Sequence, residues 1–194
     1  MPGAPLADLA VHQIALFFLI VLETQRLLFR DPEPRDLEAY CAMEADPEVR
    51  KYVGGYPRPR EVAERKFKDG LRKRTNDRLA MWATVYKPEG CYIGRCGVYP
   101  HIAGRRRVPR VGALAFYLAR AYWGRGLATE AGRAFVDFGF NELGLKKIVT
   151  AVQAGNGASI RVLEKLGFRL VEIEQGEFRV FHHFELLRAC GETR

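Results

Sequence analysis

Apolar and polar positions follow helical spacing in two early segments of the chain. Apolar residues recur every third position over residues 37–43, which predicts a helix with Asp36 as its N-cap. A second helix is expected over residues 60–74. Its many lysines and arginines would form either a solvated face or a docking surface for an anion.

Strand patterns surround these helices. Residues 23–31 are rich in Leu and Phe and stop at a proline turn, which predicts a first strand. After residue 78, aromatic and β-branched residues separated by Gly and Pro predict an antiparallel meander, with strands at 78–87, 91–100 and 111–120 and a loop at 101–110.

Helices and strands alternate in the second half. Five apolar residues fall on one stripe and predict a helix over residues 124–141, namely Leu127, Ala131, Ala134, Phe135 and Phe138. The remaining pattern predicts a helix at 156–167 and strands at 146–153, 168–175 and 178–188. No repeat or linker interrupts this order, so we expect one mixed α/β (α+β) domain.

The apolar run at residues 14–22 needs a separate interpretation. Nine residues are too few to span a bilayer, and no Lys or Arg precedes them, so neither a membrane anchor nor a signal peptide is predicted. An apolar run of this kind exposed to water would promote aggregation, so we predict that residues 14–20 are buried. They would extend the first strand or dock on a second subunit, which would make the protein a homodimer.

Composition narrows the choice of partners. The 194 residues are 48% hydrophobic and 28% charged, as in ordinary globular proteins. The net charge of +8 favours an anionic partner, which could be a phosphorylated cofactor, nucleic acid, the ribosome or an acidic peptide. Four scattered cysteines show neither a disulfide framework nor zinc spacing, so we predict no metal and a cytoplasmic location.

Two glycines mark the turn before the helix predicted over residues 124–141. The stretch YWGRGLATEA (residues 122–131) would leave the first helical N–H groups free, and Gly124 and Gly126 would let an anion approach the backbone. Arg125 could add a charge-assisted contact, so a diphosphate would fit. Alternatively, the glycines only permit a tight turn. A Walker loop is absent, and Thr129 stands where a dinucleotide fingerprint needs a third glycine.

YWGRGLATEA, followed by NGASIRVLEKLGF (residues 156–168) and preceded by ETQRLLFR, resembles the GNAT superfamily of acetyl-CoA-dependent N-acetyltransferases. The likeness is greatest to its RimJ/RimL branch, which acetylates ribosomal-protein alanines. It implies a GNAT domain over residues 21–190 after an N-terminal extension at 1–20. It also implies a mostly antiparallel mixed sheet with helices on both faces and a splayed strand pair that holds the cofactor.

The resemblance assigns roles to particular residues. The diphosphate of coenzyme A would lie on the backbone of Trp123, Gly124, Arg125, Gly126, Leu127, Ala128 and Thr129. The pantetheine would run beside Tyr117, Leu118 and Ala119, and a backbone N–H near Tyr117 would serve the reacting carbonyl oxygen. Asn156 would bond the cofactor arm, although it could equally be a helix N-cap. Ser159 would lie near the sulfur and donate a hydrogen bond to the leaving thiolate.

Departures from the family pattern leave the general base unassigned. Ala113 stands where relatives often carry a Glu, and Leu163 stands where they often carry a Tyr that acts as the catalytic acid. Water could mediate deprotonation instead, with four candidate side chains nearby, each of which could be purely structural: Glu130, Tyr99, Tyr117 and His101. Trp123 replaces a common Arg or Gln, which removes a charge but keeps the backbone donor.

The resemblance implies transfer of an acetyl group to a primary amine. We expect a protein N-terminal α-amine, for example that of a ribosomal protein. A small-molecule amine or an antibiotic is an alternative acceptor, and a non-catalytic module that binds acyl-CoA is a different kind of function. The basic run at residues 104–110 would be a solvated loop or a contact for an acidic substrate or ribosomal RNA.

Overall fold

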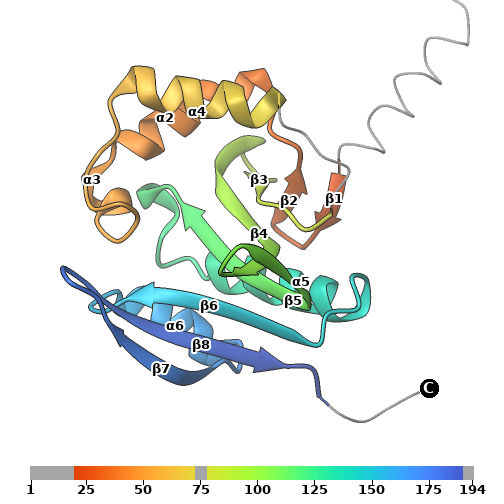
Figure 1. The fold of residues 1–194 in the computed structure, drawn as a ribbon. Coiled ribbons are helices and arrows are strands. Elements are labelled where there is room, and N and C mark those ends of the chain that lie inside the picture. Colours follow the sequence, from red (N-terminus) through yellow and green to blue (C-terminus); the bar gives the residue numbers. More distant parts are fainter. Residues whose placement is uncertain (1–19, 73–77, 190–194) are drawn as a thin grey trace, which may run out of the picture.

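A computed structural model describes residues 20–72 and 78–189. Its centre is one eight-stranded sheet in the order β1-β2-β3-β4-β5-β6-β8-β7 (Figure 1). Every neighbouring pair is antiparallel except β5 and β6. The strands are β1 (Ile20–Glu23), β2 (Leu27–Arg30), β3 (Trp82–Tyr86), β4 (Cys91–Ala103), β5 (Arg106–Leu118), β6 (Lys147–Gln153), β7 (Arg169–Gln175) and β8 (Val180–Leu187).

Helices pack on both faces of the sheet, as predicted. They are η1 (Pro34–Asp36), α2 (Leu37–Ala45), α3 (Pro47–Arg50), α4 (Arg60–Arg72), η2 (Arg120–Tyr122), α5 (Leu127–Asn141) and α6 (Gly157–Lys165). The larger core joins α5 and α6 to the sheet, with Phe29, Phe135 and Leu163 fully buried. A smaller core joins α2 and α4 to the other face through Tyr40 and Phe67.

The parallel strands β5 and β6 separate partway along their length. They pair only where residues 111–113 meet residues 147–149, although β5 continues to Leu118 and β6 to Gln153. Their arrowheads diverge toward one end of the sheet in Figure 1. The predicted splayed pair is therefore present, and the carboxyl ends of both strands flank the opening.

Two predicted elements differ from the structure. One strand is predicted over residues 23–31, but residues 20–30 form a hairpin of β1 and β2. The chain turns because the Thr24 N–H donates to the carbonyl of Leu27 at 2.9 Å and the Thr24 hydroxyl accepts from the Leu27 N–H at 3.0 Å. The predicted loop at 101–110 lies mostly within β4 and β5, since the chain reverses within two residues at Gly104, whose φ is +62°.

Asp36 precedes α2 as predicted, but its side chain does not cap that helix. Its carboxylate instead accepts two hydrogen bonds of 2.7 Å from the Arg30 guanidinium. Both side chains are buried, with exposures of 6% for Arg30 and 3% for Asp36. Leaving a buried arginine without a charged partner costs more free energy than leaving a helix N-terminus without a side-chain cap. The Asp36 carboxylate therefore pairs with Arg30.

The burial predicted for residues 14–20 falls almost wholly outside the described residues. Ile20 is the described member, and 42% of its side chain is exposed, so burial is not found there. Within residues 20–72 and 78–189, no helix has the length and apolar character needed to cross a membrane.

Candidate active site

The glycine turn before α5 provides an open backbone surface. Gly124 and Gly126 have φ values of +74° and +76°, in the left-handed region that favours glycine. A β-carbon at Gly124 would meet no atom within 4 Å, and one at Gly126 would meet only Arg26 Nη2 at 3.6 Å. Backbone conformation, not crowding by the protein, therefore requires glycine here. The same space is open to a ligand.

The first turn of α5 adds donors to this surface. Gly126 is the N-cap and supplies no side-chain cap, so the N–H groups of Leu127, Ala128 and Thr129 point into the turn. Free N–H groups and the positive helix end attract an anion such as a diphosphate. The turn thus has the groups that an anionic ligand needs.

An ion pair from the β1–β2 hairpin holds this turn. Glu130 accepts hydrogen bonds from the Thr24 hydroxyl (2.6 Å), the Arg26 N–H (3.0 Å) and Arg26 Nε (2.7 Å). Arg26 Nη1 also donates to the carbonyl of Arg125 at 2.9 Å. Burial alone would raise the pKa of Glu130, but these hydrogen bonds lower it below its ordinary value. Glu130 therefore positions the loop and is a poor proton acceptor.

Arg125 and Trp123 point to neighbours within the protein. The Arg125 guanidinium lies over the Tyr122 ring at 5.1 Å and 3.9 Å from Glu89 Oε1. Both members of that ion pair are about half exposed, so water screens it strongly. Trp123 Nε1 donates to the carbonyl of Leu118 at 2.7 Å, which ties the glycine turn to the end of β5.

Asn156 and Ser159 lie on the other side of the opening, after β6. Asn156 Oδ1 accepts from the Ser159 N–H at 3.2 Å, so Asn156 is an N-cap of α6. Ser159 is half-buried in the first turn of this helix. Because β5 and β6 are parallel, this turn and Tyr117 occupy the same end of the sheet.

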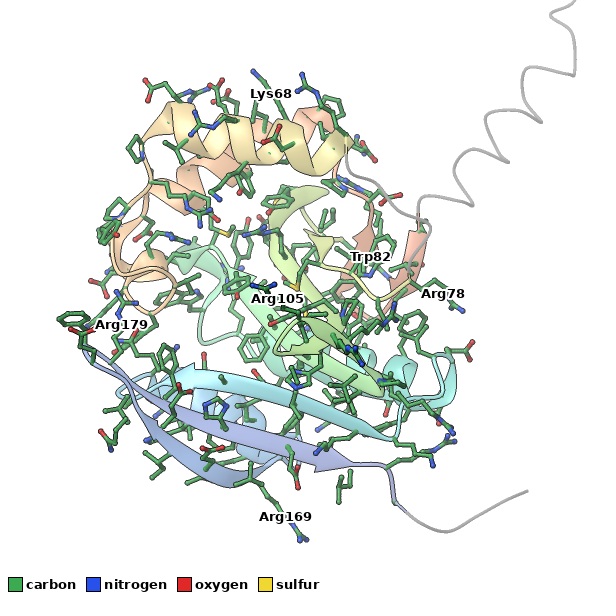
Figure 2. The ribbon with its side chains drawn as sticks, in the orientation of Figure 1. Lys68, Arg78, Trp82, Arg105, Arg169 and Arg179 are labelled. Carbon is green, nitrogen blue, oxygen red and sulfur yellow. The ribbon has the colours of Figure 1, made fainter. Side chains whose placement is uncertain are left out.

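A cavity of about 560 Å³ lies beside β5, on the face opposite α5. Tyr99, Ala115 and Tyr117 line it from the sheet, and α2, α4 and the segment after α3 supply the other walls. The Tyr52 hydroxyl donates to the carbonyl of Gly155 at 2.9 Å, which links that segment to the loop before α6. Arg179, at the far end of the β7–β8 hairpin in Figure 2, donates to the carbonyl of Gly54 at 3.4 Å.

Four charged residues that no sequence motif indicated come together beside this cavity. Glu44 of α2 is buried, with 3% of its side chain exposed, and three arginines surround its carboxylate. Arg50 Nη1 lies 3.2 Å from Oε2, Arg58 Nη1 lies 3.0 Å from Oε2, and Arg95 Nη2 lies 3.1 Å from Oε1. The three arginines come from α3, the segment before α4, and β4, so sequence spacing carries no sign of the cluster.

The tyrosines of the cavity are protonated groups at neutral pH. Burial raises the pKa of both Tyr99 and Tyr117 above its ordinary value. They can donate hydrogen bonds but are poor bases. His101 is half-buried on β4 and does not line the cavity. Ala113 and Leu163, at the two family acid/base positions, are buried in the protein interior.

Other side chains highlighted by the sequence are solvated or lie apart from this end of the sheet. Lys68 points away from α4 into solvent, as Figure 2 shows, and is 54% exposed. Residues 103–107 at the tip of the β4–β5 hairpin are exposed. Among the described residues, no group of three or more His, Cys, Asp or Glu side chains could hold a metal ion.

Comparison with known proteins shows which family the chain belongs to. The family described as the acetyltransferase (GNAT) domain matches residues 26–169. The chain belongs to the GNAT family. It is therefore an N-acetyltransferase, and this family uses acetyl-CoA.

Individual proteins resemble this chain over most of its length. YkkB of Bacillus subtilis is 34% identical over 147 residues, which cover 75% of this chain and 83% of YkkB. A GNAT acetyltransferase of Bacillus anthracis superposes with a TM-score of 0.72 at 23% identity, covering 87% of this chain and 98% of that structure. Ribosomal-protein-S5-alanine acetyltransferase of Vibrio fischeri superposes with a TM-score of 0.67 at 18% identity, covering 85% and 94%. The two structures share the fold with this chain.

Proposed function

We propose that this protein transfers the acetyl group of acetyl-CoA to the N-terminal α-amine of a protein. The observation that carries the proposal is the opening between β5 and β6. On one side of this opening lies the glycine turn at Gly124 and Gly126, where no side chain caps α5. A cavity of about 560 Å³ lies beside Tyr117. Cofactor and acceptor could therefore reach the end of β5 from different directions.

The proposed cofactor site uses backbone groups for the most part. Residues 123–129 would hold the diphosphate through their N–H groups, and Tyr117, Leu118 and Ala119 would lie along the pantetheine. Acetyl-CoA supplies the acetyl group as a thioester. Asn156 would contact the cofactor arm through its side-chain amide, while its Oδ1 keeps the N-cap bond to Ser159.

Two groups of the chain would act on the reaction itself. A backbone N–H near Tyr117 would stabilise the carbonyl oxygen as it gains negative charge. The Ser159 hydroxyl would donate a hydrogen bond to the sulfur as its bond to the acetyl carbon breaks, and the departing thiolate would take its proton from water. The acceptor nitrogen forms the new bond to that carbon and loses its proton to water, because no carboxylate stands at the Ala113 position.

The acceptor assignment is supported by resemblance and by space. The chain shares its fold with a ribosomal-protein-S5-alanine acetyltransferase, and its sequence signatures resemble the RimJ/RimL branch. The cavity has room for one or two residues of a peptide. We also propose a cytoplasmic location, since Cys41, Cys91 and Cys96 are free thiols. A GNAT domain over residues 21–190 and a homodimer remain predictions.

Calorimetry and turnover test the proposal together. Acetyl-CoA should bind by isothermal titration, and thiol release should follow on adding N-terminal peptides. Faster turnover of a small amine or an antibiotic than of any peptide would overturn the acceptor assignment. Binding of acetyl-CoA without turnover on a broad panel of amines would instead identify a non-catalytic module.

A further inference from the structure

The cavity beside Tyr117 carries surplus positive charge. Arg50, Arg58, Lys66 and Arg95 line it, whereas its nearby carboxylates are Asp69 on the wall and Glu44 next to the arginines. Asp69 Oδ1 also lies 3.9 Å from the guanidinium of an exposed arginine of α4, which partly neutralises the Asp69 carboxylate. The cationic side chains therefore outnumber the anionic ones among the described residues at this cavity.

Burial makes this surplus of positive charge unfavourable. The side chains of Arg50, Arg58 and Arg95 are 5%, 24% and 31% exposed, respectively. Like charges repel more strongly where water is excluded. In addition, the Nε atom of Arg95 is buried and has no hydrogen-bond acceptor among the described residues. An unpaired buried donor of this kind adds to the energetic cost of the cluster.

Arg95 lies directly beside the proposed reaction centre. It pairs with Tyr117 across β4 and β5, and its guanidinium lies 5.6 Å from the centre of the Tyr117 ring. The ring of Tyr40 flanks it at 5.1 Å. These contacts hold the guanidinium at the end of β5 where an acceptor amine would meet the acetyl group.

We propose that the acceptor carries a carboxylate close to its reactive amine and that the arginine cluster of Arg50, Arg58 and Arg95 binds this carboxylate. The inference rests on the proposed function and specifies its substrate class. All three arginines pair with Glu44, but Arg58 and Arg95 are exposed enough to contact the ligand as well, whereas Arg50 is buried and adds its charge from behind them. The carboxylate could belong to an acidic residue at the second position of a peptide or to a free amino acid.

Matched acceptors test the inference with the full chain. Peptides beginning Ala-Asp and Ala-Asn differ by one charge, as do free alanine and alaninamide. The carboxylate member of the productive pair should have a kcat/KM about ten- to a hundredfold greater than its amide, the range of a charge-assisted hydrogen bond. The productive pair identifies the source of the carboxylate. Equal or lower values for the carboxylate in both pairs would overturn the inference.

Variants connect the preference to the cluster. Arg58→Gln leaves Glu44 with two arginines, so the fold should persist, and it should lower the carboxylate-to-amide ratio at least about fivefold. Arg95→Gln provides a second variant if Arg58→Gln is unstable. Arg65→Gln, on the exposed face of α4, is the matched control and should keep the ratio. A high ratio that survives both Arg58→Gln and Arg95→Gln would refute the assignment.

Product binding separates this inference from the proposed function. An acetylated Ala-Asp peptide cannot react further, so its binding in the presence of coenzyme A is measured by calorimetry. It should bind about tenfold tighter than the acetylated Ala-Asn peptide. If it does so although no peptide is turned over, the acetyl-transfer proposal fails and the carboxylate site stands. Turnover of both peptides with equal product affinities would refute the carboxylate site and leave acetyl transfer to peptides standing.

Discussion

Gly126→Ala separates ligand contact from backbone strain at the glycine turn. Gly126 has a φ of +76°, where a residue with a β-carbon costs roughly 1–2 kcal/mol. The new methyl group would meet only Arg26 Nη2 at 3.6 Å, an ordinary contact, so the variant should fold. For a chain of this size, that strain lowers the melting temperature by about 2 to 8 °C. The methyl group would also stand in the proposed diphosphate path and should weaken acetyl-CoA binding at least about tenfold.

Gly144→Ala is the matched control for this experiment. Gly144 follows α5 with a φ of +63°, and a β-carbon there would meet no atom within 4 Å. It lies at the opposite end of α5 from Gly126, so it should show a similar loss of stability without a loss of affinity. Both quantities come from thermal melts and from titration with acetyl-CoA. If folded Gly126→Ala binds acetyl-CoA as tightly as Gly144→Ala, the diphosphate does not lie at this turn.

Three further substitutions probe other contacts. Ser159→Ala should lower kcat about ten- to a hundredfold, or about 1.4 to 2.7 kcal/mol, with little change in acetyl-CoA affinity, because a hydrogen bond to the thiolate strengthens as charge develops. An unchanged kcat in stopped-flow thiol release would remove this role of Ser159. Glu130→Gln should lower the melting temperature at pH 7. The pKa of Glu130 is lowered in the folded state, so the wild type should have the higher melting temperature at every pH above the unfolded pKa of about 4.3 and lose this difference as the pH falls further. A difference in melting temperature that stays constant from about pH 3 to 7 would contradict this. Asp36→Asn should cost about 1.5 to 3 kcal/mol in urea unfolding, since it removes the carboxylate that pairs with Nη1 and Nη2 of buried Arg30 and leaves Glu33, 3.3 Å from Nε, as the remaining charged partner. A loss below about 0.5 kcal/mol would show that the Arg30–Asp36 pair is dispensable.

The sequence predicted those features that depend on local spacing. The apolar stripe of α5, the glycines at 124 and 126 and the N-cap Asn156 are each set by neighbours within a few residues, and the structure has them where expected. The hairpin of β1 and β2 was missed because strand patterns continue across it. Its turn depends on one threonine hydroxyl, which a hydrophobic pattern does not register. Asp36 is the N-cap residue of α2 as predicted, but the pairing of its side chain with Arg30 could not be predicted, since Arg30 lies in the preceding strand.

The charged cluster at the cavity could not be predicted, because it exists only after α2 packs on β4. Glu44 and Arg95 are far apart in sequence and come together when the smaller core forms around Tyr40 and Tyr92. The backbone N–H of Arg58 also donates to the carbonyl of Glu44 at 2.9 Å, so the segment before α4 depends on the same residue. One buried carboxylate thus fixes three arginines at the end of β5. Cofactor contacts can be predicted from short motifs because they use the backbone of one turn, whereas acceptor contacts are assembled from separate elements and have to be determined from the fold.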